Sequence, residues 1–285
     1  MTDTWRFDAI GTRWEIETAA PLDASARAAV SRAIDGFDLS WSRFREDSTV
    51  GLLARQGGTV TAPADTADML ALYAALSDAT GGAVNPLVGD SLARRGYDAG
   101  YSFVDRGAAA APADWQQIVR WDADTLGLAQ PATIDVGALG KGRLADIVAD
   151  VVAGSATGPL VVDAGGDIVV SGRTLRVGLE HPYDPRRAIG VMEVSDGALC
   201  ASATNRRAWG EGLHHVLDAR TGVPVTRIAA TWASAADGMR ADAAATALFF
   251  DGGPALAAEW GVSWVRMRTD GTVEWSPDRK AELFL

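Results

Sequence analysis

The second half of the chain, from Gln116 onward, consists of short apolar segments broken by glycine and aspartate, and this pattern constrains the fold most. Segments of this kind are typical of β-strands joined by tight turns. Helical periodicity interrupts them at about 140–153, 239–250 and 254–260. Because the order is neither strict β-α-β alternation nor all strand, we predict an α+β fold. The predicted strands are 117–121, 132–136, 159–163, 167–171, 174–180, 190–195, 199–203, 214–218, 228–234, 263–268 and 272–275.

The first half of the chain contains more helix than strand in its pattern. We predict a strand with a bend or bulge over 7–18, a helix that begins after an Asp23 N-cap, and a second helix over about 64–80. The alanine-rich stretch 107–114 is expected to be a surface loop or flexible insertion. Since the sequence shows no internal repeat and no long linker, we predict a single domain over 1–285.

Composition excludes several classes of function. The 37 acidic and 26 basic side chains leave a net charge of -11, which argues against a nucleic-acid-binding protein. One cysteine, Cys200, and three histidines, His181, His214 and His215, make a disulfide framework or a multi-histidine zinc site improbable. The N-terminal stretch has neither a basic nor an apolar signal segment, and no apolar run is long enough for a membrane helix, so we expect a cytoplasmic protein without a membrane span.

A glycine-rich segment, DVGALGKG at 135–142, lies between a predicted strand and a predicted helix. Glycines there allow a ligand to approach the backbone, and a helix N-terminus offers amide donors to anions. The spacing is that of neither a Walker A loop nor a GxGxxG fingerprint. Lys141 is one of only two lysines in the chain. Because of this rare lysine, we weigh an anion-binding role of the segment equally with the alternative of a plain strand-to-helix turn.

Three further segments carry candidate chemistry. VDAGGD at 162–167 predicts a turn, either a plain β-turn or one that a ligand approaches. In HVLDARTGVP, His215 is either a general base or a core histidine whose hydrogen bonds are satisfied, and both readings stay open. In ADAAAT, Asp242 and Thr246 lie four residues apart on one helix face, where two hard oxygens suit Mg²⁺ or Ca²⁺. Alternatively, the aspartate complements the helix dipole.

Together, in this order and at these separations, the four segments resemble the ApbE family, the FAD:protein FMN transferases. The N-terminal IGTRW, SRFREDSTVGLL and GGAVNPLVG resemble three further family segments, so the resemblance covers about residues 8 to 275. It implies an ApbE-like (T-fold-like) architecture of mixed, mostly antiparallel sheets with packed helices. The chain departs from the family pattern at 201–209, where ASATNRRAW replaces the usual Thr-Ser-Gly segment, and we expect acceptor recognition to differ there.

The resemblance also implies a reaction and residue roles. FAD is cleaved at its pyrophosphate, FMN is joined to a threonine or serine hydroxyl of an acceptor flavoprotein, and AMP leaves. His215 is then the expected catalytic base, and Mg²⁺ is expected on the carbonyl oxygen of Ala138 with Asp242 and Thr246. The residues that the resemblance places at FAD or its binding loop are Ile10, Phe44, Ala83, Val84, Asn85, Asp135, Lys141 and Val216.

Two alternatives to the transferase remain at this level. One is an FAD pyrophosphatase, in which water replaces the acceptor hydroxyl and FMN and AMP are released. The other is a non-catalytic protein that only binds FAD. The presence of both His215 and the paired oxygens of Asp242 and Thr246 favours a catalyst over a binding protein.

Overall fold

A computed structural model describes residues 2–278 and 280–284. The expected domain over 1–285 therefore includes three residues, 1, 279 and 285, that lie outside the described residues. Within the described part, nine strands form one sheet in the order β1-β2-β6-β7-β8-β13-β14-β15, and β16 also pairs with β8. Every adjacent pair in it is antiparallel. These strands are β1 (Asp3–Ala9), β2 (Thr12–Thr18), β6 (Leu160–Asp163), β7 (Asp167–Glu180), β8 (Ala188–Ala203), β13 (Ile228–Ala235), β14 (Ser263–Arg268), β15 (Val273–Trp275) and β16 (Ala281–Leu283).

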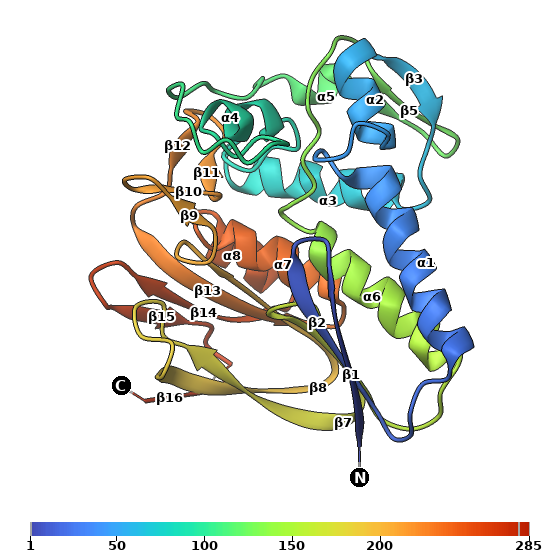
Figure 1. Ribbon diagram of the computed structural model, residues 1–285. Coiled ribbons are helices and arrows are strands. Elements are labelled where there is room, and N and C mark those ends of the chain that lie inside the picture. Colours follow the sequence, from blue (N-terminus) through green and yellow to red (C-terminus); the bar gives the residue numbers. More distant parts are fainter. Residues whose placement is uncertain (1, 279, 285) are drawn as a thin grey trace.

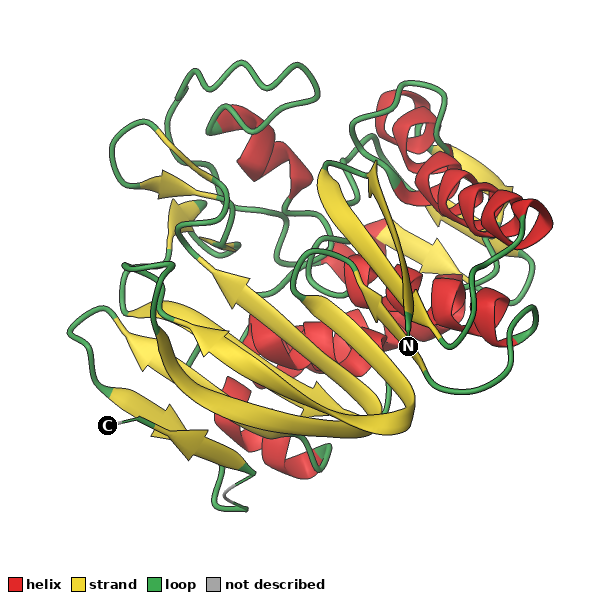
Figure 2. Ribbon diagram, turned by 60° about the horizontal axis from the view of Figure 1, so that its bottom comes forward, coloured by secondary structure: helices red, strands yellow, loops and turns green. Residues whose placement is uncertain are grey.

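Helices cover one face of this sheet. Figure 1 shows α6 and α7 side by side on that face, with α1 beyond α6, and Figure 2 shows the long curved strands in front of these helices. The core between the layers includes Trp14 and Ile16 of β2, Val30 of α1, and Leu144 and Val148 of α6, all fully buried. The helices of this layer are α1 (Ala24–Trp41), α6 (Gly140–Ala153), α7 (Gly238–Ala247) and α8 (Gly253–Glu259). Helix α3 (Thr66–Ala79) packs on α7 and α8 and shares its core with the second region.

Short elements form a second region at one end of the sheet, drawn in the upper part of Figure 1. It contains a three-stranded sheet in the order β3-β5-β4 and, on the other side of α4 in Figure 1, two pairs of very short strands, β9–β10 and β11–β12. This region supplies the loops that face the end of the main sheet. Its elements are α2 (Thr49–Gln56), β3 (Gly58–Thr61), α4 (Gly89–Arg94), α5 (Trp115–Ile118), β4 (Val119–Trp121), β5 (Thr125–Leu128), β9 (Ala208–Trp209), β10 (Leu213–His214), β11 (Leu217–Asp218) and β12 (Val223–Pro224).

The structure confirms the predicted α+β class and its mostly antiparallel sheets. The predicted helix over 140–153 coincides with α6, and Asp23 caps α1 by accepting a hydrogen bond from the Ala26 amide at 2.7 Å. None of the helices in the described residues is both long and apolar enough to cross a membrane.

Several predicted strands have different limits. The segments 167–171 and 174–180 are one strand, β7, and 190–195 and 199–203 are one strand, β8. The apparent break is a bulge, where the Gly172 amide donates to the Asp196 carboxylate at 2.7 Å and pairing continues on both sides. Glycine and aspartate interrupt the apolar pattern there without ending the strand.

Three other expectations were wrong in local detail. The stretch 7–18 is a hairpin of β1 and β2 rather than one bent strand, because Ile10 and Gly11 both take a positive φ and reverse the chain. Residues 132–136 form no strand, and 214–218 is divided into β10 and β11 by a bend at His215. The loop 107–114 is irregular, as expected, but it is anchored: the Ala111 amide donates to the Ala219 carbonyl at 2.7 Å.

Candidate active site

A cavity of about 1370 Å³ lies between the end of the main sheet and the region of short elements. It is lined by the β1–β2 turn, the segment after α1, the glycine-rich segment before α6, the β6–β7 turn and one face of α7. All twelve residues that the sequence singled out for catalysis, FAD binding or metal binding line this single cavity: Ile10, Phe44, Ala83, Val84, Asn85, Asp135, Ala138, Lys141, His215, Val216, Asp242 and Thr246.

The three predicted metal ligands lie close together. Helix α7 presents Asp242 and Thr246 on one face, one turn apart, and the Thr246 hydroxyl donates to the Ala138 carbonyl oxygen at 3.2 Å. Asp242 does not cap the helix, because Asp237 accepts from the Arg240 amide at 2.7 Å and is the N-cap. The dipole alternative for Asp242 is therefore wrong, and its carboxylate is directed toward the cavity wall.

A close helix crossing brings these groups together. Gly142 of α6 lies against Gly238 of α7, and a Cβ at Gly142 would stand 2.1 Å from the Gly238 carbonyl oxygen. The Gly142 amide donates to the Asp242 carboxylate at 2.9 Å across this crossing. Asp146, one turn further along α6, accepts from the Gly238 and Met239 amides at 2.6 and 2.9 Å. Gly142, which departs from a Walker A loop, thus serves helix packing.

The oxygen set fits a hard divalent cation. Asp242 is 4% exposed, and burial together with the nearby Asp167 raises the pKa of its carboxyl well above the usual value. A bound cation would supply the positive charge that this buried carboxylate lacks, and one carboxylate, one hydroxyl and one carbonyl oxygen are ligands that Mg²⁺ accepts. Among the described residues, no three histidine, cysteine, aspartate or glutamate side chains cluster so as to hold a metal ion, and Asp242 is the one such side chain in the predicted ligand set.

Lys141 projects from the first turn of α6 and pairs with a buried carboxylate. Its Nζ lies 2.5 Å from Oδ2 of Asp167, the last residue of the 162–167 segment, which is 1% exposed. This pair raises the pKa of Lys141 even though burial works in the opposite direction. The contact favours a role in fixing the glycine-rich segment against the β6–β7 turn, one of the two functions expected for this lysine.

The two adjacent histidines have different surroundings. His214 is buried, and its ring nitrogens meet the Val225 carbonyl at 2.9 Å and the Val216 amide at 3.3 Å. His215 lines the cavity, and its Nδ1 is buried without a hydrogen-bond partner among the described residues. Burial, and secondarily the charge of Arg207, lower the pKa of His215 to about 3. His214 is the satisfied core histidine, whereas His215 has a neutral ring whose Nδ1 has no hydrogen-bond partner among the described residues.

Asp135 holds the start of the glycine-rich segment. Its carboxylate accepts from Nε of Arg43 at 2.5 Å and from the Gly137 amide at 2.7 Å, and its carbonyl accepts from the Tyr73 hydroxyl at 2.8 Å. Both side chains of the Arg43–Asp135 ion pair are largely buried, at 4% and 13% exposure. These contacts fix the position of the Ala138 carbonyl, since the Tyr73 hydroxyl also accepts from the Ala138 amide at 3.3 Å.

The segment 83–85 forms part of the wall mainly through its backbone and apolar atoms. The Asn85 amide is used within the protein: it donates to the Pro112 carbonyl and accepts from the Leu87 amide, both at 2.8 Å. Ile10 enters from the β1–β2 turn with a φ of 45°, a conformation that is strained for a β-branched residue. Such strain is common at ligand-binding sites, where the surrounding fold imposes it.

Aromatic rings occupy the mouth of the cavity. Phe44 stacks on Tyr101 at 5.2 Å, and Tyr97 stacks on Trp209 at 5.3 Å between ring centroids. Phe103 joins the cluster at 6.0 Å from Trp209, and both Tyr101 and Phe103 are about half exposed. The cluster gives one side of the cavity a flat apolar surface suited to a planar ring.

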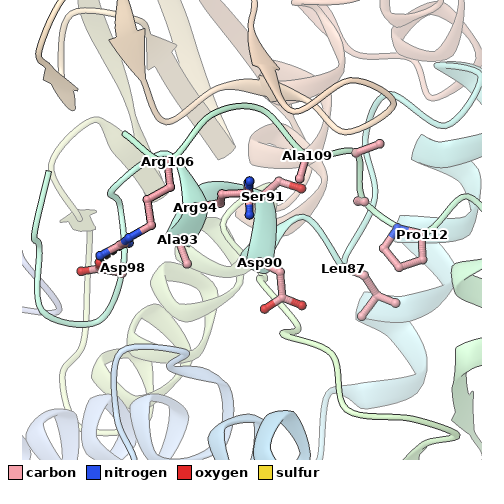
Figure 3. A pocket seen from close by; sticks show the side chains of 11 residues that line it. Leu87, Asp90, Ser91, Ala93, Arg94, Asp98, Arg106, Ala109 and Pro112 are labelled. Atoms are coloured by element: carbon pink, nitrogen blue, oxygen red, sulfur yellow. Dashed lines mark ion pairs between the residues drawn. The ribbon is translucent and has the colours of Figure 1, made fainter. Parts of the chain in front are cut away.

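A second, smaller cavity of about 460 Å³ lies on the other side of α4 (Figure 3). It is lined by Asp90 and Arg94 of α4 and by the loop that follows, where Arg106 faces Asp98 at 3.6 Å. None of the residues that the sequence analysis singled out for function lines it.

Comparison with known proteins places the chain in a family. The model of the ApbE family matches residues 10–264, which is most of the chain. The chain belongs to the ApbE family. The family resemblance read from the seven sequence segments is thereby confirmed.

Solved ApbE structures share the fold. The ApbE protein of Thermotoga maritima superposes with a TM-score of 0.84 at 22% identity, with 98% of each chain covered. The flavin transferase ApbE of Vibrio cholerae superposes with a TM-score of 0.81 at 20% identity, also with 98% of each chain covered.

Curated relatives carry the name FAD:protein FMN transferase. The protein of Rhodobacter capsulatus is 30% identical over 162 residues, which cover 53% of this chain and 31% of that protein. The protein of Treponema pallidum is 28% identical over 241 residues, which cover 72% of this chain and 65% of that protein. The chain thus spans about a third to two thirds of the length of these relatives.

Sequence reasoning missed several residues of the site. Asp167 was noted only as the end of a turn, although it is the partner of Lys141. Arg43 and Arg207 were not singled out, and neither were the rings of Tyr97 and Trp209. Arginine is the common cation of this chain, so neither arginine stands out by type; Arg43 could have been noticed only by its place beside Phe44 in the 42–48 segment.

Proposed function

We propose that this chain is a Mg²⁺-dependent FAD:protein FMN transferase that joins FMN from FAD to a threonine or serine hydroxyl of an acceptor flavoprotein and releases AMP. The observation that carries the proposal is the convergence of His215 with the Ala138, Asp242 and Thr246 oxygens in one cavity of an ApbE-family chain. The curated relatives named FAD:protein FMN transferase support the same reaction.

The residues divide the work of a phosphoryl transfer. His215, neutral because burial lowers its pKa, accepts the proton of the attacking acceptor hydroxyl. Ala138, Asp242 and Thr246 hold Mg²⁺, which when bound neutralises charge on the pyrophosphate. The Lys141–Asp167 and Arg43–Asp135 pairs keep the glycine-rich segment in place around them. Catalysis then rests on positioning and electrostatics, as phosphoryl transfer requires.

The flavin half of FAD is assigned to the aromatic side of the cavity. Phe44, with Ile10, Val216 and the segment 83–84, provides apolar surface for a planar ring. Asn85 supports this wall through its hydrogen bonds to Pro112 and Leu87 rather than by donating to the flavin.

The deciding experiment is incubation of the protein with FAD, Mg²⁺ and a candidate acceptor, followed by mass measurement of the acceptor. Transferase activity predicts a covalent adduct whose mass is that of FMN less one water, with one AMP released per adduct. Release of FMN and AMP without an adduct on any acceptor would indicate a pyrophosphatase. Binding of FAD without AMP release would indicate a binding protein and overturn the proposal.

A further inference from the structure

Arg207 lies directly across a short hairpin from His215. In the β9–β10 pair, Trp209 is opposite Leu213 and Ala208 is opposite His214, so the next pair along the register is Arg207 with His215. The His215 amide donates to the Arg207 carbonyl at 3.2 Å, which confirms this pairing. Residues opposite each other in an antiparallel pair project from the same face. Both Arg207 and His215 accordingly line the cavity.

The charge of Arg207 is not matched by a carboxylate. Its Nη1 donates to the Tyr97 hydroxyl at 3.0 Å, and no ion pair joins it to an acidic side chain within the described ranges 2–278 and 280–284. The neighbouring arginines differ: Arg43 pairs with Asp135, and Arg206 pairs with Glu180 at 3.0 Å. In a chain with a net charge of -11, a cavity-lining arginine without an acidic partner is well placed to bind an anionic ligand.

The field of Arg207 extends across the site. Its positive charge lowers the pKa of the His215 imidazole. The predicted metal ligands Asp242 and Thr246 line the same cavity, so the guanidinium shares one space with the predicted base and with these ligands. A phosphorus atom that reacts within reach of both groups would lie in the same field.

We propose that Arg207 is a further catalytic residue of this chain, whose guanidinium binds the pyrophosphate oxygens of FAD and stabilises the charge that develops during transfer. The inference rests on the proposed function. In the step, a bond forms between the acceptor oxygen and the FMN phosphorus. The bond from that phosphorus to the bridging oxygen breaks, AMP leaves with the electron pair, and the hydroxyl proton passes to His215. The negative charge that grows on the leaving AMP oxygen is the charge that an arginine stabilises.

A guanidinium is better suited to this position than a lysine. Its planar fork offers two parallel N–H donors to phosphate oxygens, while the remaining donors keep the bond to the Tyr97 hydroxyl. Arg207→Lys retains the charge but loses this geometry, whereas Arg207→Gln loses the charge and keeps much of the volume. The two variants therefore separate charge from shape.

The first test measures binding without turnover, by calorimetry in the presence of chelator and in the absence of acceptor. FAD and riboflavin share the flavin ring, but only FAD has the pyrophosphate. Arg207→Gln is expected to weaken FAD binding about 10-fold or more and to leave riboflavin binding unchanged. Arg227→Gln, which removes an exposed arginine that pairs with Asp251 at 3.1 Å and does not line the cavity, is the matched control and should bind both as the wild type does. Equal losses for FAD and riboflavin, or no loss for either, would overturn the inference.

The second test measures transfer. Arg207→Ala should lower kcat for FMN transfer by at least about 100-fold, and added guanidinium ion should restore part of the rate by occupying the vacated position. Arg207→Lys should fall between Arg207→Ala and the wild type. An unchanged transfer rate in Arg207→Ala would contradict the proposal. So would a lower transfer rate that added guanidinium does not restore, provided that the variant has the same Tm as the wild type.

The two tests keep the inference separate from the proposed function. If the wild type transfers no FMN to any acceptor and releases no AMP, the proposed function fails, and the selective loss of FAD binding decides the inference alone. If the wild type transfers FMN and Arg207→Gln does so equally well, the inference fails and the function stands.

Discussion

At the scale of single residues, the adjacent histidines His214 and His215 allow a direct comparison, because only His215 is proposed to act as the base. His215→Ala should retain FAD and Mg²⁺ binding but lose at least about 100-fold in transfer rate, the low end for a lost general base. The pKa of His215 lies at about 3, so the base is neutral above that value. At saturating Mg²⁺, which would keep Asp242 ionised, the profile of kcat/KM should therefore stay flat through about pH 6.5, where an ordinary histidine would become protonated.

His214→Ala is the control for this prediction. His214 is buried and hydrogen-bonded to Val225 and Val216, so its loss should reduce stability more than transfer in the folded fraction. Reversed behaviour of the two variants would show that the other imidazole is the base. A kcat/KM profile that falls with a midpoint near pH 6.5 would contradict the lowered pKa.

Asp242 supports a second prediction at the residue scale. Asp242→Asn keeps the volume and an oxygen for the Gly142 amide, so the fold should persist, while a neutral oxygen holds Mg²⁺ far less well. Transfer should become undetectable at low Mg²⁺ and recover only partly at high Mg²⁺. Asp150→Asn, an exposed change on α6, is the control. Equal Mg²⁺ dependence of the Asp242 variant and the wild type would remove Asp242 from the metal site.

At the scale of elements, the crossing of α6 and α7 determines whether the site forms. Gly142→Ala would place a Cβ 2.1 Å from the Gly238 carbonyl oxygen and 2.7 Å from Cβ of Asp242. We expect a loss of about 1–3 kcal/mol in the free energy of unfolding, together with loss of Mg²⁺-dependent FAD binding, because the helices must separate. Gly36→Ala, at an exposed position of α1 where an added Cβ meets nothing within 4 Å, should instead stabilise the fold by about 0.5–1 kcal/mol. Denaturant unfolding of both variants measures these changes in the free energy of unfolding. An unchanged free energy of unfolding for Gly142→Ala would contradict the close packing of α6 against α7.

At the scale of the whole molecule, the cavity joins parts of the chain that are distant in sequence. Ile10, Lys141 and His215 come from the hairpin, the helix layer and the region of short elements, so a ligand that contacts all of them should stabilise the folded state as a unit. FAD with Mg²⁺ at 100 times its Kd should add about 2.7 kcal/mol, or a rise of about 5–8 °C in Tm. Riboflavin should give a smaller rise, and chelator should reduce the effect of FAD. No change in Tm at millimolar FAD and Mg²⁺ would contradict the assignment.

Local patterns were enough to predict the helices, and the family resemblance named the candidate site residues. The i, i+3, i+4, i+7 apolar spacing predicted α6 over 140–153, because a helix that buries one face has apolar residues at this spacing. The resemblance to the ApbE family identified twelve positions that the structure brings to one cavity, since each motif keeps its chemical residues beside the turns that present them. Strand limits were less predictable: a bulge, as at Gly172, interrupts the apolar pattern in the same way as a turn does.

Only the tertiary structure decided which charges face the cavity and how they are compensated. Nothing near Lys141 in sequence indicates Asp167 as its partner, and nothing near Asp135 indicates Arg43, because both pairs form between segments joined by the fold. The sequence by itself predicted which residues would carry the chemistry. Electrostatic effects depend on distance and burial rather than on residue order. The electric field at these residues was therefore set by two features of the fold: the close approach of α6 to α7, and the hairpin register that places Arg207 beside His215.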